Sequence, residues 1–269
     1  MTARSLLFVP GNRPDRFAKA ATAGADLVLC DLEDAVAPAD KDAARAAVAA
    51  FVREQGAAVR VNAVGTPWHE RDLAALAGAA GLRAIVLPKS EVETATAIAA
   101  VVGVELYALV ESARGVRDAD RLAEVPGVTR LLFGNLDFGL DAGVSPSDAT
   151  ERELLYARSR LVIASRAAGL VAPVDGVCTD LDDAGLVRDS AGRARALGFG
   201  GKLCLHPRQV AAVNEAFAPT EKELDWARRV LEAAGESGAA VRVAGEMIDA
   251  PRLALARRLL ESARSPTVD

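Results

Sequence analysis

Leu106-Tyr-Ala-Leu-Val-Glu111 and Leu131-Leu-Phe-Gly-Asn-Leu-Asp137 are two short apolar runs that each lead to an acid. Each is followed by a segment with Ala, Leu and Val at three- and four-residue spacing, which predicts an amphipathic helix. The same alternation of apolar run and amphipathic segment recurs along residues 5–217. A repeated strand–helix order predicts a parallel sheet whose faces are covered by helices.

The alternation repeats often enough to close a barrel. Strands are expected near residues 5–9, 26–32, 58–62, 84–88, 105–110, 130–136, 174–178 and 201–205. Helices are expected near residues 14–23, 38–54, 69–79, 91–101, 114–124, 150–168, 182–198 and 207–217. Eight strand–helix units are the number that forms a TIM (β/α)8 barrel. The alternative, an open doubly wound sheet, often carries a GxGxxG first turn. The first turn here, Pro10-Gly-Asn-Arg-Pro14, lacks that pattern, which favours the barrel.

The pattern changes after residue 217. Residues 1–217 are expected to form the barrel, and residues 218–269 a C-terminal extension of additional helices. Thr220 and Glu223 have the spacing of a capping box, which predicts the start of a charged helix. The extension is expected to pack on the barrel and on a neighbouring subunit.

Composition excludes several classes of protein. The formal net charge is -5 and no basic patch is interleaved with aromatic residues, so nucleic acid is not an expected partner. No run reaches the ~18 apolar residues that a membrane span needs, and the apolar stretch Ser5–Val9 is too short for a signal peptide. A cytoplasmic protein without a membrane partner is expected. Two histidines and three separated cysteines argue against a zinc site.

Two acids are the strongest candidates for a metal site. In a TIM barrel the C-terminal ends of the strands build the active site. Glu111 and Asp137 are expected at the ends of adjacent strands, which lie ~4.8 Å apart. Their carboxylates could therefore share a hard cation such as Mg²⁺. The alternative is that they cap helices or form salt bridges.

A strand arginine is the second candidate. Arg60 alternates with Val59 and Val61, so it is expected to point into the barrel, where a guanidinium needs an anion. It would bind a substrate carboxylate or form a salt bridge with Asp31 or Glu33. These two acids could also be metal ligands or support a metal's water.

Four further residues have two interpretations each. Lys89 could bind phosphate or pair with an acid, and His206 could be a structural residue or a base. Arg13 and Arg16 could belong to a solvated helix face or hold a phosphate. Asp249, before Ala250-Pro251, reads as a helix N-cap from its spacing alone.

Together these segments resemble the citrate lyase β-subunit-like branch of the HpcH/HpaI aldolase family. The matching stretches occur in order along the chain: Arg4–Arg16, Asp31–Val36, Val59–Asn62, Leu87–Lys89, Ala108–Gly115, Phe133–Phe138, Gly201–Gln209 and Gly245–Pro251. The resemblance implies a TIM barrel that assembles as a homotrimer, binds Mg²⁺ and acts on a thioester of coenzyme A (CoA) or acyl carrier protein.

The resemblance also implies roles for individual residues. The family's metal ligands fall on Glu111 and Asp137, and its substrate-carboxylate arginine falls on Arg60. The general base that an adjacent subunit contributes falls on Asp249. The remaining expected contacts with the substrate or its CoA moiety are Arg13, Arg16, Gly134 and Asn135.

The reaction implied is the reversible cleavage of a 3-hydroxyacyl-CoA, such as malyl-CoA or citramalyl-CoA, into acetyl-CoA and a 2-oxo acid. One alternative is a citrate lyase β subunit that cleaves citryl-acyl carrier protein to oxaloacetate. A malyl-CoA thioesterase is another. A CoA-binding regulatory barrel is the non-enzymatic alternative.

Overall fold

The computed structural model describes residues 3–234, 241–243 and 246–264. Parts of the expected extension, among them Gly245 of the matched C-terminal stretch and residues 265–269, lie outside the described residues. The chain divides into two compact units, residues 2–215 and residues 216–269.

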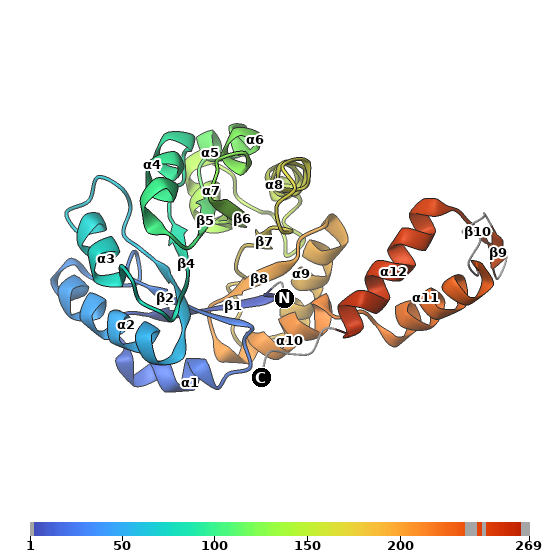
Figure 1. Cartoon of the computed structure of the whole chain (residues 1–269), viewed down its shortest axis with the longest axis horizontal. Helices are drawn as coiled ribbons and strands as arrows, with labels where there is room; N and C mark the ends of the chain where they lie inside the picture. Colours follow the sequence, from blue (N-terminus) through green and yellow to red (C-terminus); the bar gives the residue numbers. More distant parts are fainter. Residues whose placement is uncertain (1–2, 235–240, 244–245, 265–269) are drawn as a thin grey trace. The chain divides into compact units, whose positions relative to one another are not determined.

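The first unit is a closed barrel of parallel strands in the order β1 to β8 (Figure 1). The strands are β1 (Ser5–Pro10), β2 (Leu27–Asp31), β3 (Ala57–Arg60), β4 (Leu82–Leu87), β5 (Glu105–Val110), β6 (Val128–Phe133), β7 (Val174–Asp175) and β8 (Gly201–Cys204). Sequential neighbours pair in parallel throughout, and β1 pairs with β8 to close the barrel. The predicted TIM barrel is confirmed.

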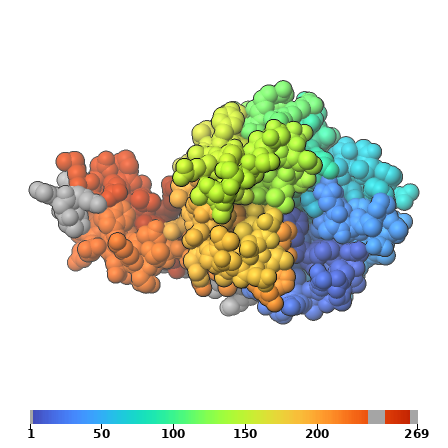
Figure 2. Space-filling model, turned by 180° about the vertical axis from the view of Figure 1, so that it is seen from behind, coloured from blue at the N-terminus to red at the C-terminus, as the bar shows by residue number. Residues whose placement is uncertain are grey.

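Helices surround the strands, as Figure 1 shows. They are α1 (Phe17–Ala21), α2 (Lys41–Gln55), α3 (His69–Leu76), α4 (Val92–Val102), α5 (Ala113–Arg117), α6 (Ala119–Ala123), α7 (Asn135–Ala142), α8 (Leu155–Ala167), α9 (Ala184–Leu197) and α10 (Pro207–Phe217). Figure 2 shows the opposite face, where the segments that follow β6 and β7, in yellow-green and yellow, form much of the near surface. The single helix expected over 114–124 is instead two short helices that meet at Asp118.

Helix α7 corrects one prediction. The strand expected over 130–136 ends at Phe133, and Gly134 caps a helix that begins at Asn135. Asp137 therefore lies in the first turn of α7, not at a strand end. The alternating apolar residues of this stretch favour a strand locally. The contact of the Phe138 ring with the Phe133 ring, 5.6 Å between centroids, needs the chain to turn back.

The barrel interior explains which side chains reach the C-terminal end. Buried residues that share the inner core include Leu29 on β2, Ala58 on β3 and Leu109 on β5. Residues two apart on a strand share a face. Asp31, Arg60 and Glu111 consequently continue these inward rows at the C-terminal end of the barrel.

In the part that the structure describes, the second unit contains two helices and one short pair of antiparallel strands. It contains α11 (Glu221–Ala234), the antiparallel strands β9 (Val241–Val243) and β10 (Glu246–Ile248), and α12 (Ala250–Arg264). The predicted capping box is present, because the Glu223 amide donates to Thr220 Oγ1 at 3.2 Å and the Thr220 amide donates to Glu223 Oε2 at 2.7 Å. Within the described ranges, no helix combines the length and the apolar character needed to cross a membrane.

Candidate active site

Glu111 is held at the centre of the acidic end of the barrel. It directly follows β5 and is only 4% exposed. The backbone N–H of Lys89 donates to its Oε1 atom at 2.7 Å. A Cβ placed on Gly134 would lie 2.4 Å from Glu111 Cβ and 2.7 Å from Glu111 Oε2. The turn between β6 and α7 thus passes so close to this carboxylate that only glycine fits there.

The surroundings of Glu111 suit a cation. Burial raises the pKa of Glu111 to about 8, and the negative charges of Glu33 and Asp137 act in the same direction, although the Lys89 amide and Arg60 oppose them. Acids that repel one another in a buried place are stabilised by a hard divalent ion, which prefers oxygen ligands. In the described part of the chain, no three His, Cys, Asp or Glu side chains converge as ligands. Mg²⁺ would fit a pair of carboxylates, because it commonly keeps water and substrate oxygens in its other positions.

The raised pKa of Glu111 predicts a pH-dependent stability in the absence of metal. Between pH 4.5 and about 8 the unfolded chain loses this proton while the folded protein keeps it. Stability should therefore fall as pH rises through this window, by up to about 1.4 kcal/mol per pH unit. Thermal unfolding in EDTA from pH 5 to 8 would measure the fall, and Mg²⁺ should restore the melting temperature at pH 8. A Glu111→Gln variant with the same pH slope would contradict the assignment.

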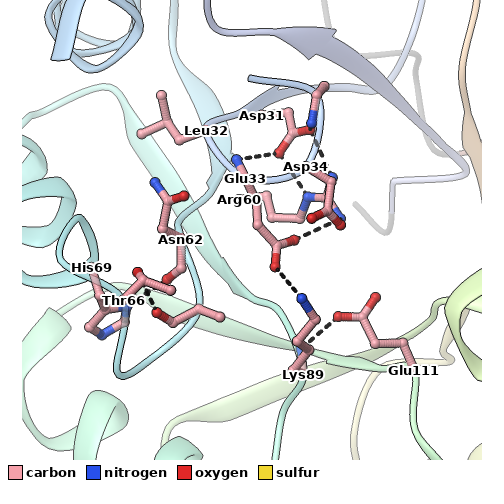
Figure 3. A network of polar contacts seen from close by, with 12 residues as sticks. Asp31, Leu32, Glu33, Asp34, Arg60, Asn62, Thr66, His69, Lys89 and Glu111 are labelled. Carbon is pink, nitrogen blue, oxygen red and sulfur yellow. Dashed lines mark hydrogen bonds and ion pairs between the residues drawn. The ribbon is translucent and has the colours of Figure 1, made fainter. Parts of the chain in front are cut away.

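Arg60 is locked into an ion-pair network (Figure 3). Its Nε and Nη2 atoms donate to the two carboxylate oxygens of Asp31, both at 2.8 Å. Its Nη1 atom lies 3.0 Å from Glu33 Oε2, and its guanidinium lies over the Phe8 ring at 5.1 Å. The salt-bridge reading of Arg60 is therefore what the structure shows, with both expected acids as partners. Whether Arg60 also binds substrate stays a prediction.

Besides Arg60, Asp31 and Glu33 contact different groups. Asp31 is 2% exposed and accepts the backbone N–H groups of Glu33 and Ala35 in addition to Arg60. Glu33 lies between two cations, because Lys89 Nζ donates to its Oε1 atom at 3.2 Å. Burial raises the pKa of Glu33 despite the opposing charges of Arg60 and Lys89.

A buried lysine that sequence reasoning missed holds this loop in place. Lys41, at the start of α2, is 5% exposed and its pKa is lowered by burial. Its ammonium donates to Leu32 O at 2.7 Å, Glu33 O at 2.6 Å and Asn62 Oδ1 at 2.6 Å. All three of its donors are used. A lysine in a helix's first turn is usually solvated, so no local signal marks it.

Asn62 links this lysine to a second buried group. Its side-chain and backbone N–H groups both donate to Asp72 Oδ2, at 2.6 and 2.9 Å, and Asp72 Oδ1 also accepts from Arg45 at 2.7 Å. His69 Nδ1 lies 2.7 Å from Asn62 O. These contacts join the loop after β2 to the loop after β3. They thereby hold Arg60, Asp31 and Glu33 in place relative to one another.

Asn135 also acts between loops. Its Nδ2 atom donates to Val177 O at 3.1 Å, and its Oδ1 atom accepts from the Val177 amide at 2.9 Å. It fastens the start of α7 to the segment after β7. The structure shows this positioning contact, and substrate binding by Asn135 stays a prediction.

The N-terminal loop presents positive charge. Arg13 forms an exposed ion pair with Asp15 at 2.7 Å, and Arg16 is exposed. Burial lowers the pKa of His206, and the positive charges of Arg208, Lys19 and Arg16 lower it further. Basic residues thus lie near the ends of β1 and β8, where Arg13 and Arg208 are each ion-paired at 2.7 Å, with Asp15 and Asp182.

Asp249 lies in the second unit. It is exposed, directly precedes α12, and accepts the Arg252 amide through Oδ1 at 3.2 Å. This is the helix N-cap expected from its spacing. Its role as a base is a separate prediction.

Comparison with known proteins gives consistent matches. A profile of the HpcH/HpaI aldolase/citrate lyase family matches residues 4–207. A "Citrate lyase subunit beta-like protein" of Deinococcus radiodurans is 39% identical, over 96% of each chain. An "L-malyl-CoA/beta-methylmalyl-CoA lyase" of Cereibacter sphaeroides is 32% identical over 86% of this chain and 83% of its own. The crystal structure of CitE from Mycobacterium tuberculosis with magnesium, acetoacetate and coenzyme A has a TM-score of 0.85, at 37% identity and 98% coverage of both chains.

Proposed function

The chain belongs to the HpcH/HpaI aldolase/citrate lyase family, and from this premise we propose that it is a Mg²⁺-dependent lyase for 3-hydroxyacyl-CoA thioesters. The resemblance drawn from the matched stretches is thereby confirmed, and so is an enzyme of the lyase type. The proposed reaction is the reversible cleavage of malyl-CoA or citramalyl-CoA into acetyl-CoA and a 2-oxo acid.

The observation that carries this proposal is the packing around Glu111. A buried carboxylate, a neighbouring Asp137 and the glycine that makes room for Glu111 form an acidic position at the C-terminal end of the barrel. Glu111 and Asp137 would hold Mg²⁺ there. Bound Mg²⁺ would act as a Lewis acid that polarises substrate oxygens.

The chain's other groups would orient the substrate and move its proton. Arg60, fixed by Asp31 and Glu33, would place a permanent positive charge beside the thioester enolate as negative charge develops there. Asp249, from a neighbouring copy in a homotrimer, would take the hydroxyl proton in cleavage or an acetyl-CoA methyl proton in condensation. Gly134 and Asn135 would line the substrate's side of α7.

The basic loop would receive the CoA moiety. Arg13 and Arg16 lie in the segment after β1. The charges of Arg16, Lys19 and Arg208 are close enough to His206 to lower its pKa. Arg13, Arg16 and Lys19 would neutralise CoA phosphates at the same end of the barrel as Glu111. The homologous CitE structure contains magnesium and coenzyme A together, which supports this pairing. We place the enzyme in the cytoplasm.

A panel of thioesters assayed in both directions tests the proposal. Malyl-CoA, citramalyl-CoA and citryl-acyl carrier protein would be supplied with Mg²⁺ or with EDTA, and products identified by mass. Acetyl-CoA and a 2-oxo acid are expected only with Mg²⁺. Release of free CoA and malate would instead identify a thioesterase. Turnover confined to citryl-acyl carrier protein would identify a citrate lyase β subunit.

Replacing Asp249 by asparagine tests the base. General base catalysis contributes typically ~10²-fold or more, so kcat is expected to fall by about 10² with Mg²⁺ affinity unchanged. Asparagine is also a good N-cap, so α12 should keep its stability. Circular dichroism melting would check that point. Full turnover by Asp249→Asn would remove the assignment.

A further inference from the structure

Asp137 depends for its position on how helix α7 begins. Its side chain is half-buried in the first turn of α7, and within the described residues no hydrogen bond or ion pair holds its carboxylate. Glu111, by contrast, accepts the Lys89 amide at 2.7 Å. The position of the Asp137 carboxylate is therefore set by the backbone of α7 and by whatever fixes the start of that helix.

Two contacts fix the start of α7. The Gly134 amide donates to Val110 O at 2.9 Å, which joins the helix to the end of β5 beside Glu111. On the other side, Asn135 Nδ2 donates to Val177 O at 3.1 Å, and Asn135 Oδ1 accepts from the Val177 amide at 2.9 Å. A side-chain amide carries both a donor and an acceptor, so it can satisfy the N–H and C=O of one backbone residue at once. The buried Asn135 thus pairs with the segment after β7 as a neighbouring strand would.

This pairing lies where the barrel wall has few backbone contacts of its own. Strands β6 and β7 pair at one position, Leu132 with Val174, whereas β5 and β6 pair along nearly all of both strands. Beyond Val174, the C-terminal edge of the barrel between β6 and β7 is joined by the side chain of Asn135. The start of α7 is therefore fastened to β7 through this one amide.

The segment after β7 is itself fixed on both sides. Asp175 is 1% exposed and pairs with Lys202 Nζ at 2.7 Å and with Arg158 Nε at 2.8 Å. Farther along the segment, Cys178 O accepts from Gln209 Nε2 at 2.8 Å. The segment is consequently a fixed anchor for α7.

Glycine at position 176 shows how closely this contact fits. Gly176 has no positive φ, so its backbone conformation would accept alanine. A Cβ placed there would lie 2.1 Å from Asn135 Oδ1 and 2.5 Å from Asn135 Cγ, and its three nearest atoms all belong to Asn135. The absence of a side chain at Gly176 therefore makes room for the Asn135 amide.

We propose that Asn135 is a positioning residue that fixes Asp137 relative to Glu111 and thereby makes the site selective for a small divalent cation. Mg²⁺ demands near-ideal octahedral geometry at about 2.0–2.1 Å, whereas Ca²⁺ accepts flexible geometry at about 2.3–2.6 Å. A helix start fastened to the segment after β7 holds the separation of the two carboxylates constant, and release from that segment would let it vary. This inference rests on the proposed function, because it takes Glu111 and Asp137 as the metal ligands.

Titration with metal alone, without substrate, is the first test. Calorimetry is expected to show that Asn135→Ala binds Mg²⁺ about 10-fold more weakly, as for loss of a group that orients a metal ligand, while its Ca²⁺ affinity changes less than about threefold. Asn214→Ala is the matched control, because it also removes an amide that donates to a backbone carbonyl, Gly24 O at 2.9 Å. The control should bind both ions as the unaltered protein does.

Three results of this titration would overturn the inference. Equal losses of Mg²⁺ and Ca²⁺ affinity in Asn135→Ala would mean that Asn135 acts on folding alone. Unchanged Mg²⁺ affinity in this variant would mean that Asp137 is placed without the amide. An unaltered protein that binds Ca²⁺ as tightly as Mg²⁺ would have no selectivity for Asn135 to provide.

Gly176→Ala tests the same contact without altering Asn135. The added Cβ should displace the amide and weaken Mg²⁺ binding by a similar factor, and this variant carries the test if Asn135→Ala folds poorly. Gly192→Ala on α9, where a Cβ meets nothing within 4 Å, is its control and should bind Mg²⁺ normally. The double variant Gly176→Ala with Asn135→Ala should bind Mg²⁺ within about threefold of Asn135→Ala alone, because the amide to be displaced is already gone. Losses that multiply in the double variant would show two independent effects and overturn the inference.

Activity separates failure of this inference from failure of the proposed function. If the unaltered protein cleaves no thioester but Asn135→Ala still loses Mg²⁺ affinity selectively, the function fails and the inference stands. If the unaltered protein is active and Asn135→Ala keeps its Mg²⁺ affinity, the inference fails and the function stands. An unaltered protein that binds no Mg²⁺ would overturn both.

Discussion

Replacing Glu111 by glutamine is expected to lower Mg²⁺-dependent turnover by about 10³-fold. The change keeps the size of the side chain but removes one of the two carboxylates proposed to hold the metal. Metal-assisted polarisation contributes several kcal/mol, and each 1.36 kcal/mol is tenfold in rate. Mg²⁺ affinity, measured by calorimetry without substrate, should fall with the activity.

The Glu111→Gln result has a sharp control. Glu105 is exposed on the same strand, β5, but at its opposite end. Glu105→Gln should keep both Mg²⁺ binding and turnover. The substitution at Glu111 should also not reduce folding at pH 8, since it removes a buried acid whose ionised form is disfavoured. Unchanged Mg²⁺ affinity in Glu111→Gln would place the metal elsewhere.

Replacing Arg60 by methionine is expected to destabilise the protein by about 3–5 kcal/mol and to abolish activity. The change removes the partner of Asp31, which is 2% exposed, and leaves Glu33 with one cation fewer. Breaking a buried ion pair is costly because an uncompensated charge stays behind. Urea unfolding followed by circular dichroism would measure the loss.

Two comparisons show whether the Arg60 effect arises from the buried pair. Arg117→Met breaks an exposed ion pair with Asp118 and should leave stability essentially unchanged. Removing both partners in Asp31→Leu with Arg60→Met should cost less than Arg60→Met alone, because the buried Asp31 carboxylate is then no longer left without its cation. A double variant less stable than the single one would show that packing, not charge, dominates.

The sequence determined the barrel because its evidence is distributed. Strand–helix units repeat along more than two hundred residues, and each short apolar run is marked by its own pattern. Errors appeared where two local signals compete. Around Asn135 to Phe138 the apolar alternation favours a strand, but Gly134 and the contact with Val177 turn the chain into α7. Asp137 therefore lies in the first turn of α7 and not at the strand end that the sequence predicts.

Residue type and inward alternation in the sequence also predicted that Glu111, Arg60 and two acids at the C-terminal end of β2 would lie at one end of the barrel, and their roles in a site stay predictions. How they are connected was decided only by the tertiary structure. The salt-bridged state of Arg60, the burial of Lys41 and the left-handed turn at Lys89 depend on loops that are far apart in the chain. Burial and hydrogen-bond partners arise from three-dimensional neighbours, so a single side chain's role can be proposed from its position but not read from it.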